Sequence, residues 1–206
     1  MSNCLNTLSP QAALCYCAKS FYDRGWMLGT AGNLSSRSDN EHFYITASGH
    51  PKGQLSESDF VLASVDNENY DDLGTNNKPS AETSIHQVIY RLYPEAKACF
   101  HVHSVDACFA TCNAIEEFAL PNLEMIKGFD IWKETPNINL PVFDNYLEVP
   151  KISEEIEKRF SQKKPALDAL MIKNHGVTVW GASIQQAFNR VEILEFILSY
   201  AARSVK

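Results

Sequence analysis

Long apolar runs, an excess of basic residues and cysteine spacings suited to disulfides are all missing from this sequence. No segment approaches the ~18 consecutive apolar residues that a membrane-spanning helix requires. Lys and Arg number 18 against 25 Asp and Glu, which gives the 206-residue chain a formal charge of −7. Nucleic acids and anionic membranes attract a basic face, so we expect neither as a partner. An anionic small molecule needs only a local site and is not excluded.

The six cysteines have spacings that favour reduced thiols over a disulfide framework. They are Cys4, Cys15, Cys17, Cys99, Cys108 and Cys112. Pairs only two or four residues apart are poorly placed to link distant segments. The first residues lack a basic stretch followed by an apolar core, so we expect no secretory signal and a cytoplasmic location. Zinc binding by Cys15 and Cys17 is conceivable, but small buried residues on an amphipathic helix are the favoured interpretation.

The order of the expected elements favours a single α/β domain over residues 1–206. Ser9 and Pro10 are suited to begin the first helix. Further helices are predicted at 81–93, 105–113, 151–164 and over roughly the last 25 residues, and strands at 33–38, 42–48, 59–66, 98–104 and on both sides of 174–176. Because the strands do not alternate regularly with helices, we expect a mostly antiparallel sheet. Arg190 and Arg203 are expected on the solvated face of the last helix, and contact with a neighbouring subunit's substrate phosphate is the alternative.

Three histidines are candidate metal ligands. His101 and His103 form an HxH pair on the strand predicted at 98–104. Residues two apart on a strand face the same way, with Cα atoms ~6.5–7 Å apart, so two imidazoles can converge on one metal ion. His175 lies in a tight turn between two apolar strands, and three imidazoles leave the open position of a catalytic zinc site. The alternative is histidines without a ligand. Cys99 shares the face of His101 and His103 and is expected to pack beneath the site, and a thiolate ligand to the metal is the alternative.

Two glycine-containing segments, 29–35 and 46–50, combine glycine with hydroxyl residues at predicted strand ends. Glycine lets the backbone approach an anion and present N–H groups, and Ser or Thr hydroxyls add further donors. Neither segment matches a nucleotide-binding loop, because the glycines of the first open a strand rather than a helix. Each alone is typical of an ordinary turn, but beside a metal site they indicate a phosphorylated substrate. The candidate phosphate-binding residues are Gly32, Asn33, Ser35, Ser48, Gly49 and Lys52.

Two carboxylates are candidates for acid–base catalysis. Glu82 follows Ser80, which is predicted to cap the helix at 81–93, so a role at the helix terminus is the simpler explanation. Glu124 lies in an apolar stretch of the irregular segment 116–147, where nothing local explains it. A partly desolvated carboxylate near a metal can act as a general acid and base. The residue chemistry alone leaves both roles open.

Six motifs in order resemble the class II aldolase and adducin family over nearly the whole chain. They are GTAGNLSSR, TASG, KPSAETSIH, HVHS, EMIKG and NHGVTVWG. An HxH pair alone is a weak signal, whereas six ordered motifs with a downstream NHG are specific. The resemblance implies a three-layer α/β/α fold around a mainly antiparallel sheet. It also implies a homotetramer with active sites near subunit interfaces.

The EMIKG and VWG motifs resemble the branch of this family that dehydrates a phosphorylated ketose. The resemblance implies a hydro-lyase with one Zn²⁺ per subunit, or another divalent metal such as Fe²⁺, bound by His101, His103 and His175. In that branch the acid–base residue corresponds to Glu124. In the sugar-phosphate aldolases of the family it corresponds to Glu82.

Three other functions are compatible with parts of this pattern. A class II aldolase or epimerase, acting for example on fuculose or ribulose phosphates, would use the same metal with Glu82. The aldolases also use a tyrosine beyond the last helix, whereas Tyr200 is predicted inside it. A cupin carries HxH on strands, but the long helices disfavour an all-β barrel. A scaffold like the adducin head domains would be expected to have lost the metal ligands, which this sequence retains.

Overall fold

Nine strands form one sheet in the computed structural model of the chain, which describes residues 5–204, so that Cys4 lies outside the described residues. In chain order they are β1 (Asn33–Arg37), β2 (His42–Thr46), β3 (Phe60–Ser64), β4 (Tyr70–Asp71), β5 (Ala98–Val102), β6 (Glu117–Ala119), β7 (Asn139–Phe143), β8 (Ala169–Ile172) and β9 (Gly176–Gly181). Across the sheet the order is β4-β3-β2-β1-β5-β9-β8-β7-β6. Neighbouring strands are antiparallel except β7 and β8. The predicted mostly antiparallel sheet is confirmed.

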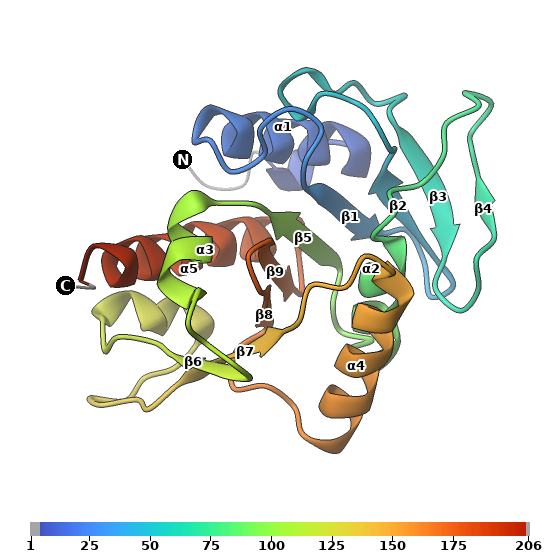
Figure 1. Cartoon of the computed structure of the whole chain (residues 1–206). Helices are drawn as coiled ribbons and strands as arrows, with labels where there is room; N and C mark the ends of the chain where they lie inside the picture. The colour runs from blue at the N-terminus through green and yellow to red at the C-terminus, as the bar shows by residue number, and fades with distance from the viewer. Residues whose placement is uncertain (1–4, 205–206) are drawn as a thin grey trace.

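Helices cover both faces of this sheet (Figure 1). On one face lie α1 (Pro10–Asp23) and α5 (Ile184–Ser204), and on the other lie α2 (Thr83–Leu92) and α4 (Val149–Gln162). The shorter helices are α3 (Val105–Thr111) and the 3₁₀ helices η1 (Leu5–Thr7), η2 (Lys52–Gln54) and η3 (Glu124–Phe129). Both α3 and η3 pack against α5. The three-layer α/β/α fold is confirmed, and no helix in the described part is long and apolar enough to cross a membrane.

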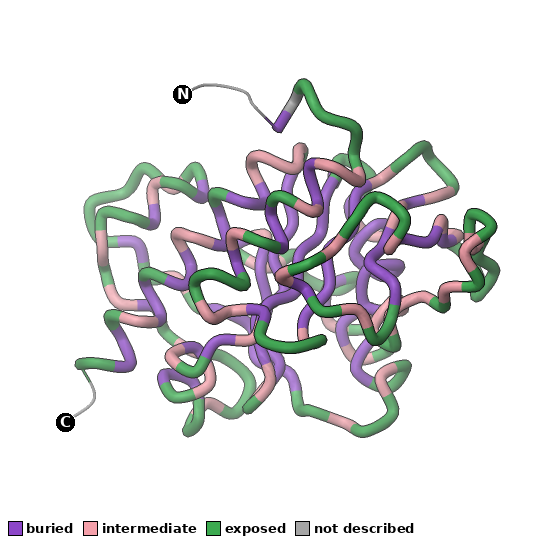
Figure 2. Tube along the Cα trace, turned by 90° about the horizontal axis from the view of Figure 1, so that it is seen from above, coloured by how far each residue is buried: buried purple, intermediate pink, exposed green. Residues whose placement is uncertain are grey.

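Each face of the sheet carries its own apolar core. Cys17 of α1 is buried in the core beneath α1 and α5. Cys99 of β5 is buried in the core beneath α2 and α4. Both cysteines therefore pack as small apolar residues. Figure 2 shows buried stretches concentrated along the central strands, with the exposed stretches at the periphery. Ser9 caps α1 as predicted, because its hydroxyl accepts from the Ala12 N–H at 3.1 Å.

The start of α2 differs from the prediction. The sequence predicts that Ser80 caps this helix, but α2 begins at Thr83. Pro79 pairs with Ala47 in an isolated antiparallel bridge, and a turn at residues 81–82 separates this bridge from the helix. Glu82 therefore stands in front of the helix rather than inside its first turn, and its side chain is free to point elsewhere.

Arg190 is buried, so the prediction that it lies on a solvated helix face is wrong. Its guanidinium donates to the Asp168 carboxylate at 2.7 Å and to the Trp180 carbonyl at 3.0 Å, and it pairs with Asp130 at 3.4 Å. These partners come from other parts of the chain, and helical periodicity does not reveal them. Arg203 is exposed, as predicted.

Candidate metal centre and active site

The register of β5 and β9 brings the three candidate histidines to one end of the sheet. His101 is on β5, His103 lies one residue beyond its end, and His175 directly precedes β9. Val102 pairs with Val177, so the turn between β8 and β9 lies beside the end of β5. The structure thus brings together all three histidines that the sequence singles out.

The turn that carries His175 is tightly constrained. A Cβ atom at Gly176 would lie 2.2 Å from the Val102 carbonyl oxygen and 3.0 Å from His103 Cδ2. Only glycine permits that approach without moving the strands. Asn174 has a φ of +54°, in the left-handed region that Asn tolerates better than most residues. The Asn-His-Gly sequence therefore fixes where the imidazole of His175 lies.

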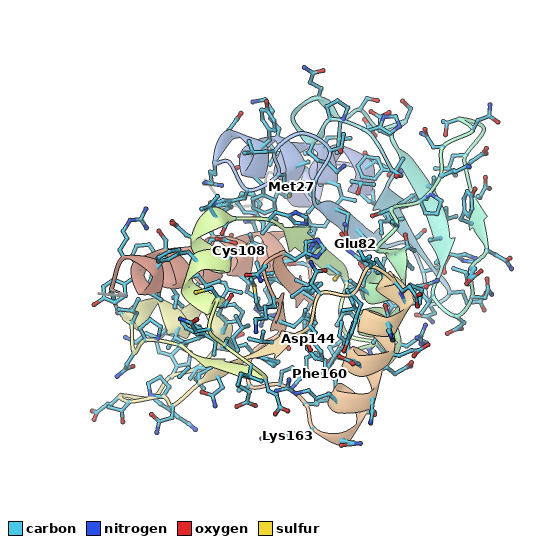
Figure 3. The ribbon with its side chains drawn as sticks, in the orientation of Figure 1. Met27, Glu82, Cys108, Asp144, Phe160 and Lys163 are labelled. Atoms are coloured by element: carbon cyan, nitrogen blue, oxygen red, sulfur yellow. The ribbon has the colours of Figure 1, made fainter. Side chains whose placement is uncertain are left out.

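Glu82 joins the histidines from the opposite side, between β5 and α2 (Figure 3). Its Oε1 lies 3.0 Å from His175 Nε2, and its Oε2 lies 3.5 Å from His101 Nε2. The Nε2 atoms of His101 and His103 are 2.8 Å apart. One ligand atom from each of the four residues lies within 4.8 Å of the others. We refer to Glu82, His101, His103 and His175 as the histidine–glutamate cluster.

Hydrogen bonds behind the cluster orient two of its rings. His101 Nδ1 lies 3.0 Å from the Thr178 hydroxyl, and His175 Nδ1 lies 3.2 Å from the Asn145 amide oxygen. Engaging Nδ1 leaves Nε2 of each ring facing the centre of the cluster. Metal-binding histidines are commonly held through their other ring nitrogen in this way.

The protonation states suit a cationic ligand. Burial lowers the pKa of His101, and it lowers that of His103 to about 3, which favours the neutral form that binds a metal ion. Burial alone would raise the pKa of Glu82, but attraction to His101 and the hydrogen bond from His175 hold it well below its usual range. Three imidazoles and one carboxylate match the donors that bind Zn²⁺, and they also suit Fe²⁺. The residues present therefore fit a divalent metal ion.

Glu124 is not part of this cluster within one chain. It begins η3, its side chain is 83% exposed, and its Oε1 accepts from the Lys127 ammonium at 2.9 Å. That helix packs against α5. Of the two candidate carboxylates, the structure brings only Glu82 to the histidines, and the catalytic role of Glu124 stays a prediction.

The candidate phosphate-binding residues divide into exposed and buried positions. Ser48 and Gly49 lie exposed in the turn after β2. Lys52 is buried, and its ammonium donates to the carbonyls of Thr30 at 2.8 Å and His50 at 3.0 Å. Burial lowers the pKa of Lys52. This ammonium ties together the two loops from which the sequence predicts a phosphate site.

The other three candidates lie at the start of β1, next to β5. Gly32 has a φ of +78°, and a Cβ there would lie 2.9 Å from the His101 carbonyl oxygen. The amide of Asn33 donates to Glu82, and Ser35 is fully buried. The structure therefore places the Asn33 side chain against the cluster and the Ser35 hydroxyl beneath it, rather than at an open surface.

Sequence reasoning did not single out four residues that hold the cluster: His86, Tyr90, Asn145 and Thr178. His86 and Tyr90 are one helical turn apart on α2 and are both buried. A buried histidine within an otherwise apolar helix face was the one signal available. Asn145 and Thr178 reach the histidines only through the arrangement of β7, β8 and β9, which local patterns do not reveal.

Residues 12–201 match the family described as Class II Aldolase and Adducin N-terminal domain. The chain belongs to the class II aldolase and adducin family. One family member, a protein of Microcystis aeruginosa named methylthioribulose-1-phosphate dehydratase, is 52% identical over 205 residues, covering 96% of this chain and 98% of the relative. A protein of the same name from Leptospira biflexa is 43% identical, covering 90% of this chain and 92% of the relative.

A solved structure shares the fold of this chain. The L-fuculose-1-phosphate aldolase from Thermus thermophilus matches with a TM-score of 0.72 and 19% identity, covering 92% of both chains. At that identity the likeness shows the architecture alone.

Proposed function

We propose that this chain dehydrates 5-methylthioribulose 1-phosphate to 2,3-diketo-5-methylthiopentyl-1-phosphate, a step of methionine salvage. The observation that carries the proposal is the convergence of one carboxylate and three imidazoles within 4.8 Å. Relatives named for this dehydration, 52% and 43% identical, support the choice of substrate. We also propose that residues 1–206 act as one domain.

The reaction breaks two bonds of the substrate. The C3–H bond next to the C2 ketone loses its proton, and the C4–O bond releases hydroxide, which leaves as water once protonated. The product of this step is an enol across C3 and C4, and its tautomerisation moves the hydroxyl proton to C4 and gives the diketone. The protein must therefore supply a base for C3, an acid for the C4 hydroxyl and stabilisation of the negative charge that develops in between.

The histidine–glutamate cluster provides the centre for this chemistry. His101, His103 and His175 would hold the divalent metal, which when bound supplies Lewis-acid stabilisation of negative charge on the substrate oxygens. Glu82 is ionised and lies within the cluster beside the histidines, so we assign to it the removal of the C3 proton. Its 12% exposure limits the access of competing water.

We assign protonation of the departing C4 hydroxyl to Glu124. Because this carboxylate lies outside the cluster of its own chain, the assignment requires a neighbouring copy. A homotetramer with active sites at its subunit interfaces would bring Glu124 of one subunit to the cluster of the next. The exposure of Glu124, and its single short ion pair with Lys127, leave it available for such a contact.

The substrate phosphate is assigned to the loops on either side of Lys52. Ser48 and Gly49 offer an exposed turn, and Gly32 and Asn33 lie buried at the end of the adjacent loop. An ammonium has three N–H donors, and two of those on Lys52 are used by backbone carbonyls. The third N–H can donate to a phosphate oxygen. Ser35 lies beneath the phosphate site, and its hydroxyl holds other side chains in place.

A sugar-phosphate aldolase is the second candidate function, and the position of Glu82 inside the cluster is the observation that favours it. The two activities give different products from the same substrate. Dehydration gives the diketone phosphate, whereas aldol cleavage between C3 and C4 gives dihydroxyacetone phosphate and methylthioacetaldehyde.

Incubating the metal-replete protein with 5-methylthioribulose 1-phosphate and identifying the phosphorylated product by ³¹P NMR distinguishes the two. We expect the diketone phosphate as the main product. Dihydroxyacetone phosphate, or unchanged substrate, would overturn the proposal.

A further inference from the structure

A line of buried polar side chains runs from α2 to the histidine–glutamate cluster. We propose that Tyr90, Ser35 and His86 are positioning residues, which fix the Asn33 amide so that it donates to Glu82 and holds that carboxylate against the histidines. The functional consequence of this inference rests on the proposed function. The hydrogen-bond arrangement itself does not.

The contacts along this line are continuous. The Tyr90 hydroxyl lies 2.8 Å from Ser35 Oγ, and Ser35 Oγ lies 2.6 Å from His86 Nδ1. His86 Nε2 lies 2.5 Å from Asn33 Oδ1, and Asn33 Nδ2 donates to Glu82 Oε2. None of the first four residues is more than 2% exposed. Water therefore does not compete for these groups, and each must find its partner within the protein.

The direction of every hydrogen bond in the line is set by its two ends. Glu82 is a carboxylate and only accepts, so Asn33 must face it with the amide NH₂ group and face His86 with its oxygen. His86 must then donate from Nε2. Burial lowers the pKa of His86 to about 3, so the ring is neutral and its Nδ1 accepts from the Ser35 hydroxyl. Ser35 Oγ in turn accepts from Tyr90, whose pKa burial raises well above its usual value.

The outer end of the line is fixed in place. The Arg37 guanidinium lies 4.7 Å from the centre of the Tyr90 ring, and the Phe43 ring centre lies 4.9 Å from it. Arg37 also donates to the Tyr90 carbonyl at 2.7 Å. Ser35 has an alternative acceptor in the Cys99 carbonyl at 3.2 Å. The contact with Tyr90 thus favours the arrangement in which the serine hydroxyl donates to His86 rather than to the Cys99 carbonyl.

If the hydrogen bonds of this line were reversed, the change would reach Glu82 through the Asn33 amide. If His86 presented a lone pair at Nε2, the Asn33 amide would rotate and turn its oxygen toward the carboxylate. Two acceptors would then face each other, and Glu82 would move away from His101 and His175. The line therefore controls where the carboxylate points without touching substrate, which defines these three residues as positioning rather than catalytic.

The first test compares two buried tyrosines that are three residues apart. Tyr90→Phe removes the hydroxyl that orders the line. Tyr93→Phe is the matched control, because its hydroxyl is buried without a hydrogen-bond partner among the described residues. We expect Tyr90→Phe to lower kcat about 3- to 10-fold with KM unchanged, the loss of one net hydrogen bond. Tyr93→Phe should match the wild type. Equal kcat values for the two variants would overturn the proposal.

The second test varies the reach of the residue at position 86. The amide nitrogen of Gln falls near the position of histidine Nε2, so His86→Gln can still donate to Asn33, whereas His86→Asn is too short. We expect His86→Gln to retain more of the wild-type kcat than His86→Asn. With Co²⁺ replacing the native metal, the visible absorption bands should stay near wild type in the Gln variant and shift in the Asn variant. The reverse order in either readout contradicts the positioning role.

A third measurement does not depend on turnover. In ¹⁵N NMR of histidine-labelled wild-type protein, His86→Gln identifies the signals of His86 by their absence. The proposal requires that Nε2 carry the proton and that Nδ1 be unprotonated. A proton on Nδ1 would overturn the proposal even in an active enzyme. The expected tautomer, found in a protein without dehydratase activity, would support the arrangement and refute the proposed function alone.

Discussion

The histidine–glutamate cluster and the segment that carries Glu124 are held in different ways. Around the cluster, paired strands fix the backbone, and hydrogen bonds to Thr178 and Asn145 orient two of the rings. In the other region, η3 is anchored on its inner side by Ile126 and Phe129, which are buried against the core. Its outer side is exposed. The first region is complete within one chain, whereas the second presents its carboxylate outward.

The outward side of the η3 region combines exposed aromatic and charged side chains with a cavity. Trp132 is 74% exposed close to Glu124 and Lys127, and the Lys127 ammonium lies 5.6 Å from the centre of its ring. A cavity of about 370 Å³ is lined by these residues together with Asn122 and Leu123. Under the proposed function, Glu124 would act on the cluster of a second subunit, although its own segment is anchored within one chain.

The largest effects are expected from removing either carboxylate. Glu82→Gln and Glu124→Gln should each lower kcat roughly 10²- to 10⁴-fold, the range for loss of a general acid or base. Steady-state assays with the phosphorylated ketose measure both. Full activity of Glu124→Gln would show that the η3 region has no part in the chemistry.

Mixing these two inactive variants tests whether the two carboxylates of one active site come from different chains. If Glu124 acts on the cluster of a neighbouring copy, oligomers reassembled from Glu82→Gln and Glu124→Gln chains contain some sites with both carboxylates intact. We expect activity to return after co-refolding and to be absent from either variant refolded alone. No recovery in verified mixed oligomers would place both groups in the same chain.

An alanine at a glycine in each region should have unequal effects on stability. At Gly176 the added Cβ would meet the Val102 backbone oxygen at 2.2 Å, which only a shift of the strands relieves. At Gly128 it would meet Ile193 Cδ1 at 2.1 Å, the end of a side chain that can rotate. We expect Gly176→Ala to cost at least about 3 kcal/mol and Gly128→Ala about 1 kcal/mol in urea unfolding. Equal losses of unfolding free energy would show that the backbone at Gly176 shifts as easily as the Ile193 side chain rotates.

An effect on stability without an effect on turnover is expected at Glu195 of α5, the helix that packs against both α3 and η3. Burial raises the pKa of this carboxyl from 4.5 to about 7, although the Ser104 hydroxyl donates to it at 2.5 Å. The folded state thus binds the proton more tightly than the unfolded state. The stability gained is complete below pH 4.5 and is lost as the pH rises through about 7, a change of up to about 3 kcal/mol.

Glu195→Gln is neutral at every pH and should remove this dependence. We expect the variant to melt at a higher temperature than the wild type at pH 8 and to lose that advantage at pH 5. Parallel melting curves across the range would show that Glu195 is not protonated in the folded state. Turnover per folded molecule should be unchanged, which separates stability from the chemistry of the two regions.

Local patterns predicted the features that depend on neighbours in sequence. The strand carrying His101, the tight turn at His175 and the cap at Ser9 all follow from short motifs, and the structure confirms each. Long-range pairing decided the rest. The bridge between Pro79 and Ala47 overrides the cap expected at Ser80, so the position of Glu82 could not be predicted.

Local sequence patterns also could not predict which side chains are buried by residues far away in the chain. Arg190 is polar and sits on a helix, and only the positions of Asp168 and Trp180 make it a buried residue. The Ser35 hydroxyl is typical of a phosphate loop in sequence, yet α2 places His86 and Tyr90 over it. Long-range packing decides which side chains meet across the sheet, and a short stretch of sequence does not reveal it.

Metal content shows whether the histidine–glutamate cluster is a metal centre. Elemental analysis of the purified, metal-replete wild type should give about one divalent metal ion per chain. His103→Ala, which removes one ligand, should lose most of that metal, while Glu124→Gln should keep it, because Glu124 lies outside the cluster. Wild-type protein without stoichiometric metal, or full occupancy in His103→Ala, would show that the three histidines do not form the metal centre.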